Sequence, residues 1–297
     1  MALSVGIVPV NTGAYIDQNF LTEFGKLVED LGYESLWTFE HVIIPEKYES
    51  IYPYNPKGKI ALSGQESFVD PLVAISFLAA ATQKLRFGTG VNILSQSNPL
   101  YLAKQVSSID HLSGGRLSLG VGVGWLEEEF KALGVPFSRR GARADEYLDG
   151  MRSVWSGEVT NIDGEFLSWK GFRMLPTPAQ RNPGTGRPTV PIIIGGTSKA
   201  AVRRAVKRGD GWYVIHRDLE HFRELMTKLR SECEIQERNI NDLEITAYWN
   251  FGREGLEGAR AYEEEGVHRL MINTAALRMG DPMTAAKRFA EEVFPIL

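Results

Sequence analysis

The adjacent residues Glu40 and His41 are the clearest candidates for chemistry in this chain. An imidazole changes its charge near neutral pH, and a neighbouring carboxylate can orient the ring or stabilise its charged form. The pair directly follows the short apolar run Ser35–Phe39, which predicts a buried strand. A satisfied structural histidine is the plainer alternative, but the position after a strand and beside a carboxylate favours function. We therefore predict that His41 and Glu40 are catalytic.

The segment after this pair is the longest connection between predicted elements and runs to about Phe68. It contains Tyr48, Tyr52 and Tyr54. A connection of this length within a compact domain is usually functional. We expect it to lie over the site as a lid.

Three further strand ends carry glycines where side chains would stand. Their sequences are Gly88-Thr89-Gly90-Val91-Asn92, Gly120-Val121-Gly122-Val123-Gly124-Trp125 and Ile194-Gly195-Gly196-Thr197-Ser198. Glycine in a strand is destabilising unless something approaches the backbone closely, so these ends predict contact with a flat or phosphate-bearing ligand. Tight turning is the alternative for one such motif, whereas three adjacent motifs favour a ligand. None of them has the G-x-G-x-x-G spacing of a dinucleotide site.

The segment Gly195–Ser198 leads directly into a predicted helix, Ser198–Arg208. Free backbone N–H groups and two hydroxyls at the positive end of a helix are suited to bind an anion. A simple N-cap role for Thr197 or Ser198 is compatible with this interpretation. Arg217, two residues beyond the next strand, would add a positive charge, with a solvent-facing arginine as the alternative.

Other catalytic patterns are missing from the sequence. The five histidines form no H-x-x-x-H or H-E-x-x-H pair, so no metal site is predicted, and neither G-x-S-x-G nor a Walker sequence occurs. Because the strand ends offer few acids, bases or nucleophiles, a bound cofactor must supply the reactivity.

Alternating strand and helix patterns position these candidates. Strands are predicted at Leu3–Val8, Ser35–Phe39, Leu85–Asn92, Arg116–Val121, Val190–Ile194, Gly211–Ile215, Leu243–Asn250 and Arg269–Asn273. Eight strands, each followed by a helix, indicate an α/β fold, a single (β/α)8 TIM-barrel domain over residues 1–297. The Gly- and Pro-rich residues 156–190 form an insertion after the fourth βα unit. The active site of such a barrel lies at the C-terminal ends of the strands, where the candidates above lie.

Composition limits the class of partner. The 297 residues include 33 Lys and Arg and 37 Asp and Glu, which gives a net charge of -4. This charge disfavours binding to nucleic acid and to anionic membranes. The densest basic run, 203–208, falls on the polar face of a predicted helix. The lone Cys233 lacks the electropositive surroundings of a reactive thiol, and no long apolar stretch or export signal is present. We expect a cytoplasmic protein that acts on a small molecule.

At this point the sequence resembles the bacterial luciferase-like family of flavin and deazaflavin oxidoreductases. The strongest block runs from Leu85 through Asn98-Pro99-Leu100, Leu112–Leu117 and Gly120–Trp125 to Arg140–Glu146, and Gly209-Asp210-Gly211-Trp212 extends it. The most similar branch comprises actinobacterial enzymes that use 8-hydroxy-5-deazaflavin, coenzyme F420.

The resemblance implies where a cofactor would bind. The ring would lie over the third and fourth strand ends, at Gly90, Val91, Asn92, Gly122, Val123, Gly124 and Trp125, against a bulged non-prolyl cis peptide. Its phosphate would meet Gly195, Gly196, Thr197 and Ser198. His41 matches a histidine near the ring, and Glu40 takes the position of an aspartate. Trp125 replaces a glutamate of the sugar-phosphate dehydrogenases, which suggests an apolar or aromatic wall.

These observations favour an oxidoreductase that transfers a hydride between F420 and a small organic substrate. The alternative is an FMN-dependent monooxygenase that uses reduced flavin and oxygen. A non-catalytic flavin-binding protein is disfavoured by the lid and by His41. A cofactor-free isomerase or aldolase is disfavoured because no lysine is predicted at a strand end facing the mouth. Family members are commonly dimers, so we expect a homodimer, formed through helices of the early half of the chain.

Overall fold

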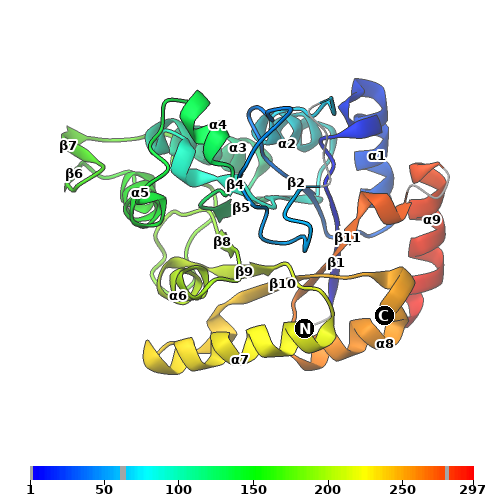
Figure 1. Ribbon diagram of the computed structural model, residues 1–297. Coiled ribbons are helices and arrows are strands. Elements are labelled where there is room, and N and C mark those ends of the chain that lie inside the picture. The colour runs from blue at the N-terminus through cyan, green and yellow to red at the C-terminus, as the bar shows by residue number, and fades with distance from the viewer. Residues whose placement is uncertain (1–2, 61–64, 278–280) are drawn as a thin grey trace.

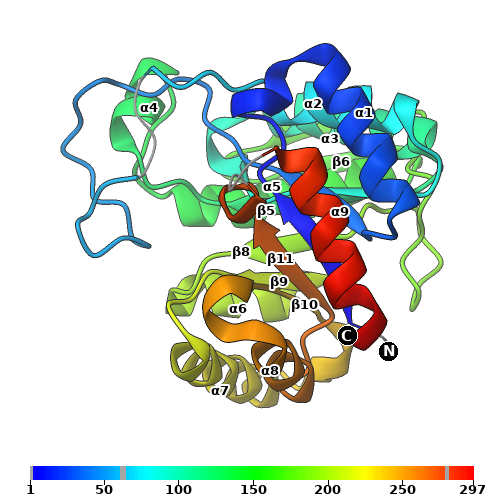
Figure 2. The same cartoon turned by 90° about the vertical axis from the view of Figure 1, so that its right-hand side faces the viewer.

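The computed structural model describes residues 3–60, 65–277 and 281–297, and it has the predicted barrel (Figures 1 and 2). The barrel strands are β1 Ser4–Val8, β2 Ser35–Thr38, β3 Arg86–Thr89 with β4 Asn92–Ile93, β5 Leu117–Gly122, β8 Ile192–Gly195, β9 Gly211–Val214, β10 Glu244–Tyr248 and β11 Arg269–Asn273. All are parallel, in the order β3-β2-β1-β11-β10-β9-β8-β5, and β3 also pairs with β5. This last pairing closes the ring.

Helices surround the ring on its outer side (Figure 2). Their bounds are α1 Gln18–Asp30, α2 Pro71–Ala81, α3 Pro99–Ser113, α4 Glu127–Ala132, α5 Arg140–Trp155, α6 Lys199–Arg208, α7 Leu219–Ile235, α8 Phe251–Glu264 and α9 Pro282–Val293. Short 3-10 helices occupy Gly13–Ile16, Leu94–Gln96, Ile240–Asp242, Thr274–Leu277 and Phe294–Ile296. Local sequence sets several boundaries: Asp70 and Asn98 cap α2 and α3, each of which begins with a proline.

The third barrel strand is interrupted, whereas the sequence predicts one strand over Leu85–Asn92. The Gly90–Val91 peptide is cis, which separates β3 from β4 and confirms the bulge that the resemblance implies. On one side of the bulge Gly90 N donates to Thr38 O at 2.6 Å. On the other side Asn92 and Ile93 pair with Val121 and Gly122 of β5.

Two glycines at the strand ends, Gly88 and Gly120, are required by packing inside the barrel and not by contact with a ligand. Trp37 and Tyr213 stack inside the barrel with ring centroids 5.5 Å apart. A Cβ on Gly88 would lie 2.5 Å from the Trp37 ring, and one on Gly120 would collide with the Thr89 carbonyl oxygen. Our explanation of the glycine motifs by ligand contact is therefore wrong for Gly88 and Gly120.

The insertion contains an antiparallel hairpin of β6, Thr160–Asp163, and β7, Ser168–Phe172, which extends beside α5 (Figure 1). The Glu146 carboxylate of α5 accepts hydrogen bonds from main-chain amides of the hairpin turn, among them Leu167 N at 2.7 Å. Trp169 packs against the core, whereas Phe172 is exposed.

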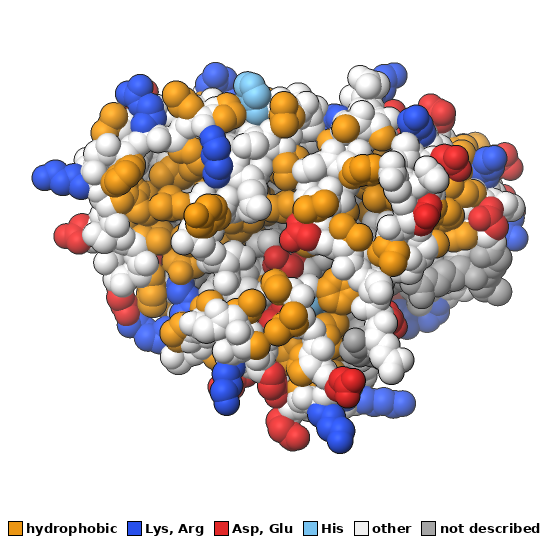
Figure 3. Space-filling model, turned by 90° about the horizontal axis from the view of Figure 1, so that it is seen from above, with side chains coloured by type: hydrophobic (Ala, Val, Ile, Leu, Met, Phe, Trp, Pro, Cys, Tyr) orange, Lys and Arg blue, Asp and Glu red, His pale blue; other side chains and the backbone are white. Residues whose placement is uncertain are grey.

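Helices α2 and α3 expose several large apolar side chains. Val73 and Phe77 of α2 and Tyr101 and Leu112 of α3 lie at the surface. Figure 3 views the molecule from the side where α2, α3 and α4 lie in Figure 1, and it shows hydrophobic side chains in groups on that face. None of the helices described is long and apolar enough to cross a membrane.

Candidate active site

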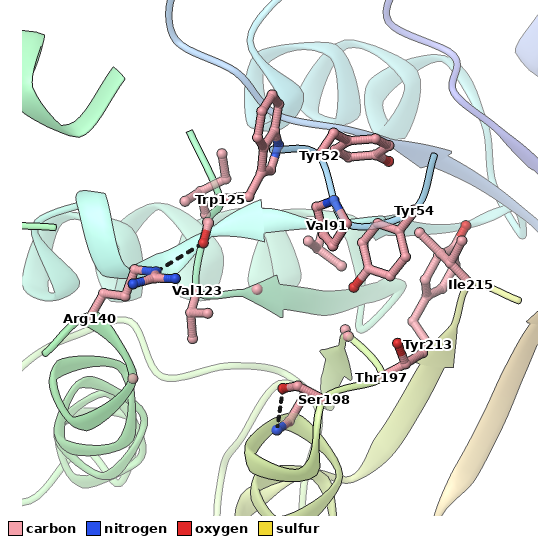
Figure 4. Close-up of a pocket in the computed structure, with 18 of the residues that line it drawn as sticks. Tyr52, Tyr54, Val91, Val123, Trp125, Arg140, Thr197, Ser198, Tyr213 and Ile215 are labelled. Carbon is pink, nitrogen blue, oxygen red and sulfur yellow. Dashed lines mark hydrogen bonds between the residues drawn. The ribbon is translucent and has the colours of Figure 1, made fainter. Parts of the chain in front are cut away.

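A cavity of about 800 Å³ lies at the C-terminal ends of the barrel strands. Of the site residues predicted from the sequence, all but Asn92 and Arg217 line this cavity. The predicted residues that line it are Glu40, His41, Gly90, Val91, Gly122, Val123, Gly124, Trp125, Gly195, Gly196, Thr197 and Ser198. Figure 4 shows Trp125 and Tyr52 at one end, Thr197 and Ser198 at the other, and Val91 and Tyr54 between them. The volume of this cavity is within the range of small-molecule sites.

The two exceptions are corrections to the sequence prediction. Asn92 is buried in β4, where it pairs with Val121 and does not reach the cavity. Arg217 is exposed outside the cavity, with its Nε 3.4 Å from His221 Nδ1. The arginines that line the cavity are Arg139, Arg140 and Arg204, and Arg140 Nε donates to Gly124 O at 3.1 Å.

One of these arginines, Arg204, comes from the basic run on α6. The sequence suggests that this run is a solvated face, but Arg204 is buried and its Nε donates to Asp145 Oδ1 at 2.6 Å. Because its charge is already paired with a carboxylate, Arg204 contributes mainly to the cavity wall.

His41 is oriented by a residue that the sequence prediction missed. Its Nδ1 lies 2.8 Å from Oε2 of Glu129 in α4, and the two side chains are 5% and 0% exposed. Glu40, the predicted partner, instead accepts a hydrogen bond from the Ile93 backbone N–H. The carboxylate that can support a charge on His41 is therefore Glu129.

Glu40 has an unusual electrostatic environment. Burial, aided by the Asp70 and Glu129 carboxylates, raises the pKa of Glu40 from 4.5 to about 8, against the lowering effect of the Ile93 N–H. A protonated carboxyl can both accept and donate hydrogen bonds. Glu40 thus links the loop after β2 to the bulged segment of β4.

Helix α4 also holds the loop over the cavity, through hydrogen bonds from Glu49 and Ser50 to Glu128 that we call the Glu128 clamp. The Glu128 carboxylate accepts hydrogen bonds from Glu49 N at 2.6 Å, Ser50 N at 3.2 Å and the Ser50 hydroxyl at 2.6 Å. Although burial opposes the effect, these hydrogen bonds lower the pKa of Glu128 to about 2. Figure 2 shows the long loop projecting at one end of the barrel near α4.

Aromatic side chains form one wall of the cavity. The Trp125 ring makes edge contacts with Tyr48 and Tyr52 of the loop, at centroid distances of 5.4 and 5.1 Å, and with His41 at 5.9 Å. The wall that replaces the glutamate of the sugar-phosphate enzymes is therefore aromatic, and the loop contributes to it.

The strand-end glycines shape the cavity floor around Val91. A Cβ on Gly122 would lie 2.8 Å from Val91 Cγ2, and one on Gly195 would lie 2.6 Å from Val91 Cγ1. The Val91 side chain therefore sits in space left by two neighbouring strands. This close approach is the physical reason for glycine at both positions.

The opposite end of the cavity suits an anion. Gly196 has a φ of +108°, which favours glycine, and the Trp212 indole N–H donates to its carbonyl at 2.8 Å. Ser198 caps α6 through its hydroxyl, which accepts from Ala201 N at 3.2 Å. The Thr197 backbone N–H donates to the Tyr54 hydroxyl of the loop. A narrow cradle of glycine backbone, hydroxyls and helix N-terminus thus faces a long apolar floor, which fits a planar ring with a phosphate tail.

The sequence of the chain is similar to those of known proteins. Residues 4–251 match the family model described as luciferase-like monooxygenase. An uncharacterized protein of Mycobacterium tuberculosis is 30% identical over 260 residues, which cover 87% of this chain and 86% of that protein. The FMNH(2)-dependent dimethylsulfone monooxygenase of Pseudomonas putida is 32% identical over 139 residues, which cover 46% of this chain and 36% of that protein.

The fold is shared with a solved structure at low sequence identity. The coenzyme F420 dependent tetrahydromethanopterin reductase of Methanopyrus kandleri has a TM-score of 0.75 at 15% identity, with 99% of each chain covered.

Proposed function

Because the chain belongs to the luciferase-like monooxygenase family, whose members are F420- or FMN-dependent oxidoreductases, we propose that it transfers a hydride between coenzyme F420 and a small organic substrate. The bound cofactor supplies the hydride chemistry. The observation that carries the proposal is the buried His41, which is paired with Glu129 and lines the same cavity as the Val91 floor. Hydride transfer to or from such a substrate leaves a proton to be moved, and His41 is placed to move it.

The chain's own residues have separate tasks in this proposal. Val91 supports the ring, and the cradle of Gly196, Thr197 and Ser198 holds the phosphate through the backbone N–H groups of Gly196 and Ser198 and the hydroxyls of Thr197 and Ser198. Trp125 and the tyrosines of the loop exclude water from the cavity. His41 holds or releases a proton at Nε2, since Nδ1 is engaged by Glu129.

An FMN-dependent monooxygenase is the second candidate, favoured by the identity to the dimethylsulfone monooxygenase. The experiment is to mix the purified protein with each reduced cofactor and to follow binding and oxygen uptake. Tight binding of F420 without oxygen consumption supports the proposal. Oxygen uptake that depends on FMN supports the monooxygenase and overturns the proposal.

A non-catalytic flavin-binding role is tested by His41→Ala. A storage protein has no use for a proton-transferring group, so under that role no turnover would exist to be lost. Under our proposal, turnover falls by about 10²- to 10⁴-fold while cofactor affinity is retained.

We also propose that the protein is a cytoplasmic homodimer. The exposed apolar side chains of α2 and α3, including Phe77 and Leu112, support association with a second copy through these early helices. Light scattering of the eluted protein should give twice the mass of the 33.1 kDa chain. A mass of one chain would contradict the dimer.

The buried Cys233, whose thiol pKa is raised by burial, fits a reducing compartment.

A further inference from the structure

Glu129 divides its two carboxylate oxygens between two segments of the site. Oε2 lies 2.8 Å from His41 Nδ1. Oε1 accepts from Val42 N at 2.6 Å and from Gln96 Nε2 at 3.3 Å, with Ile43 N farther away at 3.4 Å. The first oxygen therefore fixes the imidazole, while the second fixes the main chain of the same loop just after it.

The chemistry of these partners determines the position of the histidine proton. The amides around Oε1 are all donors, which is the environment that an ionised carboxylate requires. An ionised carboxylate can only accept, so the proton of a neutral His41 must lie on Nδ1. Nε2 then has a free lone pair in a ring that lines the cavity and could accept a proton there.

The surroundings keep this arrangement rigid. Glu129 is 0% exposed at its side chain, and the imidazole makes edge contacts with both Phe39 and Trp125. Glu40 cannot take over the role of Glu129, because its hydrogen bond is made to the Ile93 N–H on β4.

We propose that Glu129 is a positioning residue that holds His41 in the Nδ1–H tautomer, so that Nε2 accepts the proton when the substrate gives up its hydride. This inference rests on the proposed function for its catalytic meaning. The position of the proton itself does not depend on any cofactor.

The variant Glu129→Gln keeps nearly the same side-chain shape, but it should place the His41 proton on the other ring nitrogen. The glutamine oxygen stays with the amides of Val42 and Ile43, which need an acceptor, so its NH₂ group faces His41. An NH₂ group donates, so Nδ1 becomes an acceptor and the proton moves to Nε2. The matched control is Glu128→Gln, which alters the neighbouring loop clamp without touching His41.

The experiment is ¹⁵N NMR of the full chain labelled at histidine nitrogen, without cofactor, at a pH where His41 is neutral. A His41→Asn variant assigns the signal. We expect Nδ1–H in the wild type and in Glu128→Gln, and Nε2–H in Glu129→Gln. With cofactor present, kcat of Glu129→Gln should fall by about 10²- to 10⁴-fold with little change in KM.

Two results would overturn the inference: a wild-type spectrum with the proton on Nε2, or a Glu129→Gln spectrum with an unchanged tautomer. The wild-type spectrum decides the matter even if the variant fails to fold. Failure of the proposed function looks different, since the protein would then bind neither F420 nor FMN while the tautomer could still be read.

Discussion

Glu40 and His41 are neighbours in sequence, yet their side chains bind different parts of the fold. The two side chains diverge just beyond β2, which ends at Thr38. The Glu40 carboxyl reaches the backbone of Ile93, and the His41 imidazole reaches Glu129 of α4. The carboxylate next to a histidine in sequence is therefore a weak guide to the carboxylate that orients it.

The buried carboxyl of Glu40 should make stability depend on pH. Its pKa in the folded chain, about 8, lies above its ordinary value of 4.5. The folded state therefore binds the proton more tightly, and its contribution to stability is complete below pH 4.5 and is lost as the pH rises through 8. Between these values the free energy of unfolding should fall by about 1.4 kcal/mol per pH unit.

Glu40→Gln removes this titration and keeps an oxygen that can accept from Ile93 N–H. Urea unfolding from pH 5 to pH 9 should show the variant gaining stability relative to the wild type as the pH rises. Glu46→Gln, at an exposed position of the same loop, should follow the wild type. Parallel profiles for wild type and Glu40→Gln would show that the carboxyl is not protonated in the fold.

At the scale of elements, hydrophobic patterning predicts the barrel well because each strand is buried on both faces. The sequence predicts eight strands near their observed positions, and the alternation with helices determines the topology. The pattern also places the glycines of these strands at the mouth of the barrel, but it does not reveal which contacts require them. Gly88 faces Trp37 and Gly195 faces Val91, contacts between strands that no local pattern encodes.

The floor of the cavity gives the prediction at this scale. Gly195→Ala would place a Cβ 2.6 Å from Val91 Cγ1, so we expect a loss of about 1–3 kcal/mol in stability from overpacking. Adding Val91→Ala removes the opposing methyl groups and should recover part of that loss. Denaturant unfolding of the two single variants and the double variant measures the coupling.

A matched control is Gly184→Ala, where the nearest atom to an added Cβ is Asn182 Oδ1 at 3.5 Å. This change should leave stability almost unaltered. Additive effects of Gly195→Ala and Val91→Ala would contradict direct contact between the two positions.

At the scale of the whole molecule, the site is completed by segments that lie far apart in sequence. The loop after β2 meets α4 through Glu128 and Glu129, and it meets the start of α6 through Tyr54. The barrel fold predicts that all three segments gather at the mouth, since each follows the C-terminal end of a strand. Which glutamate binds which backbone amide depends on side-chain geometry across 78 to 87 positions, and the sequence could not reveal it.

The Glu128 clamp should control the opening of this loop without controlling the fold. Glu128→Ala removes the acceptor for Glu49 N, Ser50 N and the Ser50 hydroxyl. Hydrogen exchange of the Glu49 and Ser50 amides should accelerate about tenfold or more, while amides of the barrel strands keep their protection. Glu127→Ala, one residue earlier and exposed, should leave these amides unchanged. Because hydrogen bonds hold the Glu128 pKa near 2, the clamp should persist as the pH falls from 7 to 4 and weaken only below that. Equal acceleration throughout the barrel would mean that Glu128 stabilises the whole fold and is no clamp of the loop.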